Sequence, residues 1–197
     1  MWTREMFGMD FYHILAAFII YSILGWLVES IYMSICNRKL TNRGFAFGPF
    51  CPIYGFGAVI GYIILHPLSD NVILLYITGA VTATAFEFLV GKMMIKLFGE
   101  LWWDYNEKPC NYKGIICLES TIAWGAYAVI IIMFLHGFVL EFIDRYPSHY
   151  GIIACKIVMA LVAVDYAYHL LEAFGVNVKE YKERMVDKYR SFKARWY

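Results

Sequence analysis

Charged residues are scarce in this sequence, and no polar stretch is long enough to form a soluble domain. Asp, Glu, Lys and Arg make up 17% of the 197 residues, whereas hydrophobic residues make up 61% and the mean hydropathy is +0.56. Soluble domains are typically about half apolar and about a quarter charged. The composition therefore excludes an ordinary soluble protein and indicates an integral membrane protein, with one bundle accounting for the whole length.

Motifs of the common catalytic and metal-binding classes are also missing. The sequence has no G-x-x-x-x-G-K-[ST] loop for cradling phosphates, no nucleophile elbow and no two-metal signature. Its five cysteines match no zinc-site spacing, and no histidine lies close enough in sequence to complete one. We therefore expect no cofactor, no metal site and no nucleic-acid partner. We favour a non-enzymatic protein, and no catalytic residue is identified.

Five apolar runs approach or reach the roughly 20 residues that a helix needs to cross about 30 Å of hydrocarbon. They predict transmembrane helices at about residues 11–36, 52–68, 71–97, 116–140 and 150–173. The second run is short and rich in glycine, so we expect it to be tilted or partly re-entrant. The predicted fold is an all-α membrane bundle of about five helices over residues 1–175, with a re-entrant or irregular loop on the cytoplasmic side.

Basic residues predict the orientation of these helices. Arg38, Lys39 and Arg43 follow the first run, three lysines follow the third and seven Lys/Arg follow the fifth, whereas the opposite side has Arg4 and Arg145. Loops rich in Lys and Arg stay in the cytoplasm. We therefore predict that the N-terminus lies outside and the C-terminus inside.

The last 22 residues, 176–197, carry seven Lys/Arg and three acids, and their apolar residues recur at steps of three and four. This spacing predicts a basic amphipathic helix in the cytoplasm. Such a helix can lie on the anionic inner leaflet or bind a partner. It can equally pack as a soluble helix on the protein's own loops.

Ionisable side chains within the apolar runs are the strongest functional signal. Each costs at least about 2.5–3.5 kcal/mol near the centre of a span, which makes each a candidate for a functional role. Glu29 lies near the end of the first run, Glu87 in the second half of the third and Glu119 at the start of the fourth. Asp165 and His169 lie one helical turn apart in the fifth. All four acids are predicted near the cytoplasmic side.

The loop Asn42–Gly57 contains four glycines and two prolines, which prevent a continuous helix. Irregular backbone at membrane depth is tolerated where protein buries it or where it lines a watery cavity. We expect a re-entrant, cavity-lining loop in which Arg43 pairs with a buried carboxylate and Tyr54 donates a hydrogen bond. The alternative is an interfacial turn in which Arg43 only anchors the protein to the membrane surface.

Two further segments add polar candidates on the same side. The loop 101–114 contains Asp104 and Asn111 among interfacial aromatic residues, and Asp104 is predicted to pair with Arg43, to orient a ligand, or to be simply solvated. The stretch "GWLVES" (25–30) is mirrored by "ESTIAWG" (119–125), which places Ser120 and Trp124 opposite the first run. The predicted binding residues are Glu29, Arg43, Glu87, Asn42, Tyr54, Asp104, Asn111, Glu119, Ser120 and Trp124.

These motifs resemble a bacterial family, the ABC-transporter type IV or CmpB-like permeases. The resemblance runs from about Tyr21 to Gly125 through "YSILGWLVES", "NRGFAFGPFCPIYGFGA", "FEFLVGKMMIKLFGELWWDYNEKPCNYKGIICLES" and "AWG". It implies a multi-pass permease of the bacterial plasma membrane. Since the chain has no phosphate loop, any ATPase subunit would be a separate polypeptide. The matching motif positions are Glu29, Asn42, Arg43, Gly44, Gly48, Pro49, Pro52, Tyr54, Gly55, Glu87, Trp103, Asp104, Tyr105, Asn111, Gly114, Ser120, Trp124 and Gly125.

Three functions of different classes fit the sequence. The first is a transport component whose cytoplasm-facing acidic cavity binds a small polar or cationic solute. The second is an intramembrane enzyme that acts on a lipid-like substrate at the inner leaflet, with Glu and Asp as acid and base and Arg43 holding an anionic group. The third is a non-catalytic membrane partner whose polar cluster only holds the bundle together. The excess of carboxylates over nearby cations favours the first, because lysines can extend to water.

Overall fold

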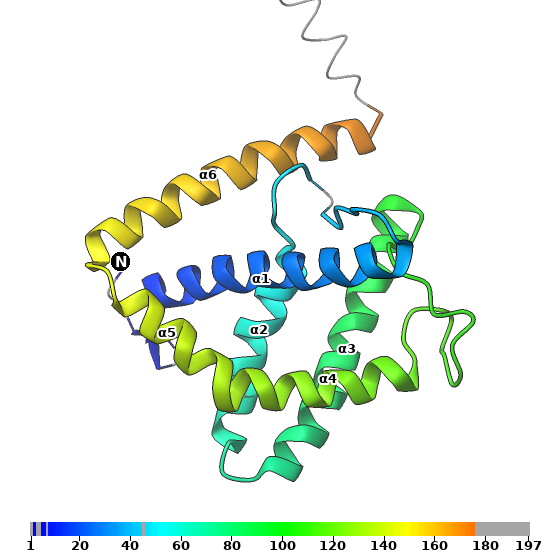
Figure 1. Ribbon diagram of the computed structural model, residues 1–197, viewed down its shortest axis with the longest axis horizontal. Helices are drawn as coiled ribbons and strands as arrows, with labels where there is room; N and C mark the ends of the chain where they lie inside the picture. The colour runs from blue at the N-terminus through cyan, green and yellow to red at the C-terminus, as the bar shows by residue number, and fades with distance from the viewer. Residues whose placement is uncertain (1, 3–4, 7, 45, 176–197) are drawn as a thin grey trace, which may run out of the picture.

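The computed structural model describes residues 2, 5–6, 8–44 and 46–175, and within them it is a bundle of helices (Figure 1). The predicted tail helix, 176–197, lies outside the described residues. A short antiparallel hairpin, β1 and β2, precedes the first helix. The elements are β1 (Glu5–Met6), β2 (Met9–Asp10), α1 (Phe11–Asn37), α2 (Pro52–Leu65), η1 (His66–Leu68), α3 (Val72–Phe98), α4 (Leu118–Ile130), the π-helical turn η2 (Ile131–Leu135), α5 (His136–Asp144) and α6 (Ser148–Ala173).

Within the described residues, four helices are long and apolar enough to cross a membrane: α1, α3, the continuous α4–η2–α5 and α6. They confirm the predicted all-α membrane bundle. The fourth predicted span, 116–140, is observed within Leu118–Asp144, a continuous helix in which a single π-helical turn joins α4 to α5. The second predicted span is a shorter apolar helix, Pro52–Leu68.

Local sequence explains where the helices begin and end. The side chains of Asp10 and Asn71 accept hydrogen bonds from backbone N–H groups in the first turns of α1 and α3. Cys117 and Ser120 form a reciprocal cap at the start of α4. Gly99 ends α3 in the left-handed region, at φ 77°.

Helix α1 lies at the centre of the fold, between α6 on one side and the other helices (Figure 1). Its first half packs with α2, α5 and α6 into one apolar cluster that includes Tyr12, Ala17 and Ile143. A second cluster joins α2, α3 and α4. Helix α6, described along its whole length, has a single buried residue, Cys155. Most of the α6 surface is therefore available to lipid.

The chain after α1 turns back along the same helix instead of leaving it. Ser22, the deepest residue of α1 to which this loop is hydrogen-bonded, is 15 residues from the end of the helix, or roughly 22 Å at 1.5 Å per residue. Four α1 residues at successive four-residue steps carry the contacts. With the donor first, the hydrogen bonds are Thr41 N–Ser34 Oγ (2.9 Å), Arg43 N–Ser30 Oγ (3.2 Å), Trp26 Nε1–Asn42 Oδ1 (2.7 Å) and Cys51 N–Ser22 O (3.0 Å).

Helix α2 therefore begins deep in the bundle, as the predicted re-entrant loop requires. Its 14 residues extend about 21 Å, so the loop and the helix together return the chain to the other end of the bundle. The approach of α2 to α1 depends on glycine. A Cβ on Gly25 would collide with the ring of Tyr54, and one on Gly55 would lie 2.6 Å from the carbonyl oxygen of Phe18.

Candidate functional site

Glu29 and Arg43 form an ion pair where the re-entrant loop passes α1. Arg43 Nε lies 3.0 Å from Glu29 Oε1, and Tyr54 Oη donates to the other carboxylate oxygen at 3.0 Å. The two charged side chains are about a quarter exposed, at 24% for Glu29 and 26% for Arg43. Arg43 also donates from Nη2 to the carbonyl oxygen of Trp102 at 2.8 Å. We call these four residues the Glu29 cluster.

Glu87 lies in a second cluster, and the three hydrogen bonds to its carboxylate come from uncharged donors. Tyr105 Oη donates to Oε1 at 3.1 Å, and Ser120 Oγ and Trp124 Nε1 donate to Oε2 at 3.2 and 3.0 Å. Glu87 is 5% exposed. We call these residues the Glu87 cluster, and it joins α3, α4 and the loop between them.

The two clusters are neighbours. The Arg43–Trp102 bond ties the loop after α1 to the loop after α3, which carries Tyr105 of the second cluster. Burial and the neighbouring Glu87 carboxylate both raise the pKa of Tyr105. Tyr105 therefore remains a protonated donor throughout the physiological pH range.

The structure thus divides Glu29, Arg43 and Glu87, three of the predicted binding residues, between two clusters. Arg43 pairs with Glu29, as expected, and the Glu87 carboxylate is satisfied by α4 and the loop after α3. Each of the two mirrored stretches contributes to one cluster. Glu29 of the stretch 25–30 belongs to the Glu29 cluster, and Ser120 and Trp124 of the stretch 119–125 donate hydrogen bonds to Glu87.

Other predicted residues have local roles. Asp104 accepts hydrogen bonds from the backbone N–H and the side chain of Asn106, at 2.8 and 2.7 Å. One prediction for Asp104 was instead an ion pair with Arg43. Asn111 donates to two carbonyl oxygens and accepts from a backbone N–H of its own loop. Asn42 accepts from Trp26. Glu119 is exposed and forms an ion pair with Lys108 at 2.9 Å.

Asp165 of α6 binds the re-entrant loop from the opposite side. Its carboxylate accepts hydrogen bonds from the backbone N–H groups of Phe47 at 3.2 Å and Gly48 at 2.8 Å. His169 Nδ1 lies 3.3 Å from the same carboxylate. A Cβ on Gly48 would lie 3.1 Å from the carboxylate, so glycine permits this close contact.

Sequence reasoning missed two features. One is the stripe of Ser22, Trp26, Ser30 and Ser34, whose four-residue spacing was the available signal for a loop bound to that face. The other is His136, which directly follows the π-helical turn and is 2% exposed. Its ring stacks on the ring of Tyr62, with 3.8 Å between the ring centroids. The available signal for His136 was its position as an ionisable residue within an apolar run.

Four long apolar helices and two buried carboxylate clusters define a multi-pass membrane protein. The family model described as "Putative ABC-transporter type IV" matches residues 16–170, which is most of the chain. The protein therefore belongs to that family, as the motifs predicted. No curated protein and no solved structure gives a significant match.

Proposed function

We propose that this protein is a membrane transport component and that the Glu87 cluster binds a small cationic solute. The observation that carries the proposal is the surroundings of Glu87, a buried carboxylate whose three hydrogen bonds within the described part of the chain all come from neutral groups. A buried charge is normally neutralised by a partner of opposite charge. A transported cation would supply this partner when it is bound.

The carboxylate has a spare hydrogen-bond acceptor position for such a ligand. A carboxylate can accept about four hydrogen bonds, and Tyr105, Ser120 and Trp124 occupy three of these positions. The indole and phenol rings also provide π faces, which attract cations. A cation with one N–H group or a small alkali ion would fit this chemistry better than an anion.

The Glu29 cluster has a different role in this proposal. Its carboxylate is already neutralised by Arg43, which also binds the loop after α3 through the Trp102 carbonyl. Breaking the ion pair would free the Arg43 side chain from α1, and this side chain also links the re-entrant loop to the loop beside Glu87. The Glu29 cluster is therefore proposed to fix the entrance to the solute site, and the solute itself binds at Glu87.

Orientation and partners follow from the loop charges and the family. We place the N-terminus outside and the C-terminus inside the bacterial plasma membrane, which puts Lys39, Lys108 and Lys113 on the cytoplasmic side. The Glu87 site then opens toward the cytoplasm. A separate ATPase subunit is the proposed energy source, because family membership points to ATP-driven transport and the chain has no phosphate loop.

A thermal-stability screen tests the solute site. The purified protein would be heated with a panel of organic and inorganic cations, and the change in melting temperature measured. A solute at 100 times its Kd stabilises the folded protein by about 2.7 kcal/mol. We expect Glu87→Gln to lose the response and Glu119→Gln, the exposed control, to keep it. A response of equal size in both variants, or none to any cation in the wild type, would refute a cation site at Glu87.

A further inference from the structure

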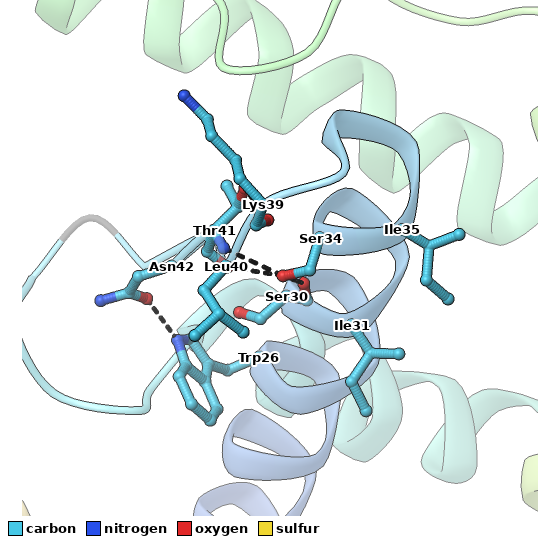
Figure 2. Close-up of a pocket in the computed structure, with 9 residues that line it drawn as sticks. All are labelled: Trp26, Ser30, Ile31, Ser34, Ile35, Lys39, Leu40, Thr41 and Asn42. Atoms are coloured by element: carbon cyan, nitrogen blue, oxygen red, sulfur yellow. Dashed lines mark hydrogen bonds between the residues drawn. The ribbon is translucent and has the colours of Figure 1, made fainter.

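A hollow of about 710 Å³ lies between the last turns of α1 and the start of the re-entrant loop (Figure 2). Ligand pockets in proteins commonly range from about 300 to 1,000 Å³. The hollow is separate from both carboxylate clusters. Its lining consists of Trp26, Ser30, Ile31, Ser34, Ile35, Lys39, Leu40, Thr41 and Asn42.

The lining changes character along the helix. Trp26 is at the deep end, 11 residues or roughly 16 Å from the end of α1, and Lys39 is at the rim. Between them, Ile31, Ile35 and Leu40 are 50%, 71% and 98% exposed. These three exposed side chains line the same hollow, and grouped exposed apolar residues mark ligand-binding or membrane-contact surfaces. The hollow therefore presents an apolar wall that leads up to a cation.

The hydroxyl groups of the hollow are already engaged with the protein. Ser34 Oγ donates to the Ser30 carbonyl oxygen at 2.6 Å and accepts from Thr41 N at 2.9 Å. Trp26 Nε1 donates to Asn42, as the dashed line in Figure 2 shows. These bonds hold the wall in place and leave the exposed apolar side chains and the Lys39 ammonium to contact a ligand.

We propose that this hollow binds an anionic phospholipid, with its phosphate near Lys39 and an acyl chain along Ile31, Ile35 and Leu40. The lining contains one cation, Lys39, and no acidic residue, and Arg38 precedes Lys39 in the sequence. Basic residues at the end of a membrane helix attract anionic headgroups. A free phosphate would use the cations but leave the apolar wall uncovered, so an amphiphile matches the whole surface. This inference does not depend on the proposed transport function.

Lipid retention tests the proposal. The full-length protein would be extracted from nanodiscs that contain equal amounts of phosphatidylglycerol and phosphatidylcholine, and the bound lipids counted by native mass spectrometry. One Lys near the surface accounts for about a fivefold preference for an anionic lipid. Lys39→Gln should therefore reduce the phosphatidylglycerol preference about fivefold, and Ile35→Trp, which fills the hollow, should reduce retention of both lipids.

Two matched variants serve as controls. Lys96→Gln removes an exposed lysine at the end of α3, and Ile73→Trp enlarges an exposed apolar residue of α3 outside the hollow. Both should retain lipid as the wild type does. The proposal is wrong if the wild type shows no preference or if Lys96→Gln acts as strongly as Lys39→Gln. It is equally wrong if Ile35→Trp has no effect, or if inorganic phosphate displaces the bound species.

Discussion

The ion pair between Glu29 and Arg43 allows a quantitative prediction. Both side chains are about three-quarters buried, and Glu29 accepts hydrogen bonds from Arg43 and Tyr54 at 3.0 Å each. A hydrogen bond to a charged group contributes about 1.5–3 kcal/mol. Glu29→Gln keeps one acceptor oxygen but loses the charge, so we expect a loss of about 2 kcal/mol in the free energy of unfolding.

Arg43→Gln should cost as much or more, because it leaves the Glu29 carboxylate with Tyr54 alone. In the double variant neither charge is left unpaired. The coupling energy, the difference between the double variant and the sum of the single variants, should therefore be at least about 1 kcal/mol. The assay is reversible unfolding of the purified protein by a denaturing detergent, followed by intrinsic tryptophan fluorescence.

The ion pair between Lys108 and Glu119 is the internal control for this cycle. It has a similar distance, 2.9 Å, but its side chains are 46% and 64% exposed. Solvent screens such a pair, and we expect its coupling to be too small to resolve. Additive effects at Glu29 and Arg43, within about 0.5 kcal/mol, would show that the pair does not connect the loop to α1.

Two other perturbations act on the same loop. Gly25→Ala should push the Tyr54 ring away from Glu29 and lower the melting temperature, whereas Gly61→Ala, with nothing within 4 Å of its Cβ, should not; equal melting temperatures would contradict the close packing of α2. Asp165→Asn should weaken the acceptor for the Gly48 N–H, at about 1–3 kcal/mol, and hydrogen exchange of that amide should speed up. An unchanged exchange rate would mean that α6 does not hold the loop.

Much of the fold could be predicted because hydrophobic length determines it. The long apolar runs became α1, α3, α4–η2–α5 and α6, and the prolines and glycines after α1 correctly indicated an irregular, re-entrant segment. The end of the fourth span was misplaced by four residues. The helix continues to Asp144 through Glu141, a charged residue that ends an apolar run in the sequence without ending the helix.

The site was harder to predict because contacts across the fold decide it. The sequence predicts the acids near one side of the membrane, but their division between two clusters depends on which loop reaches which helix. Arg43 reaches Glu29 because the loop hydrogen-bonds to Ser30 and Ser34, and Tyr105 reaches Glu87 because the loop after α3 folds back. Neither path is visible in the spacing of the charged residues.

The most direct test of the account is solute transport by cells that carry the Glu87→Gln variant. The cation identified by the stability screen would be supplied in radioactive form, and its accumulation compared between wild type, Glu87→Gln and Glu119→Gln at equal amounts of protein in the membrane. We predict that Glu87→Gln abolishes the protein-dependent change in accumulation and that Glu119→Gln preserves it. Equal accumulation with wild type and Glu87→Gln would contradict a transport site at Glu87.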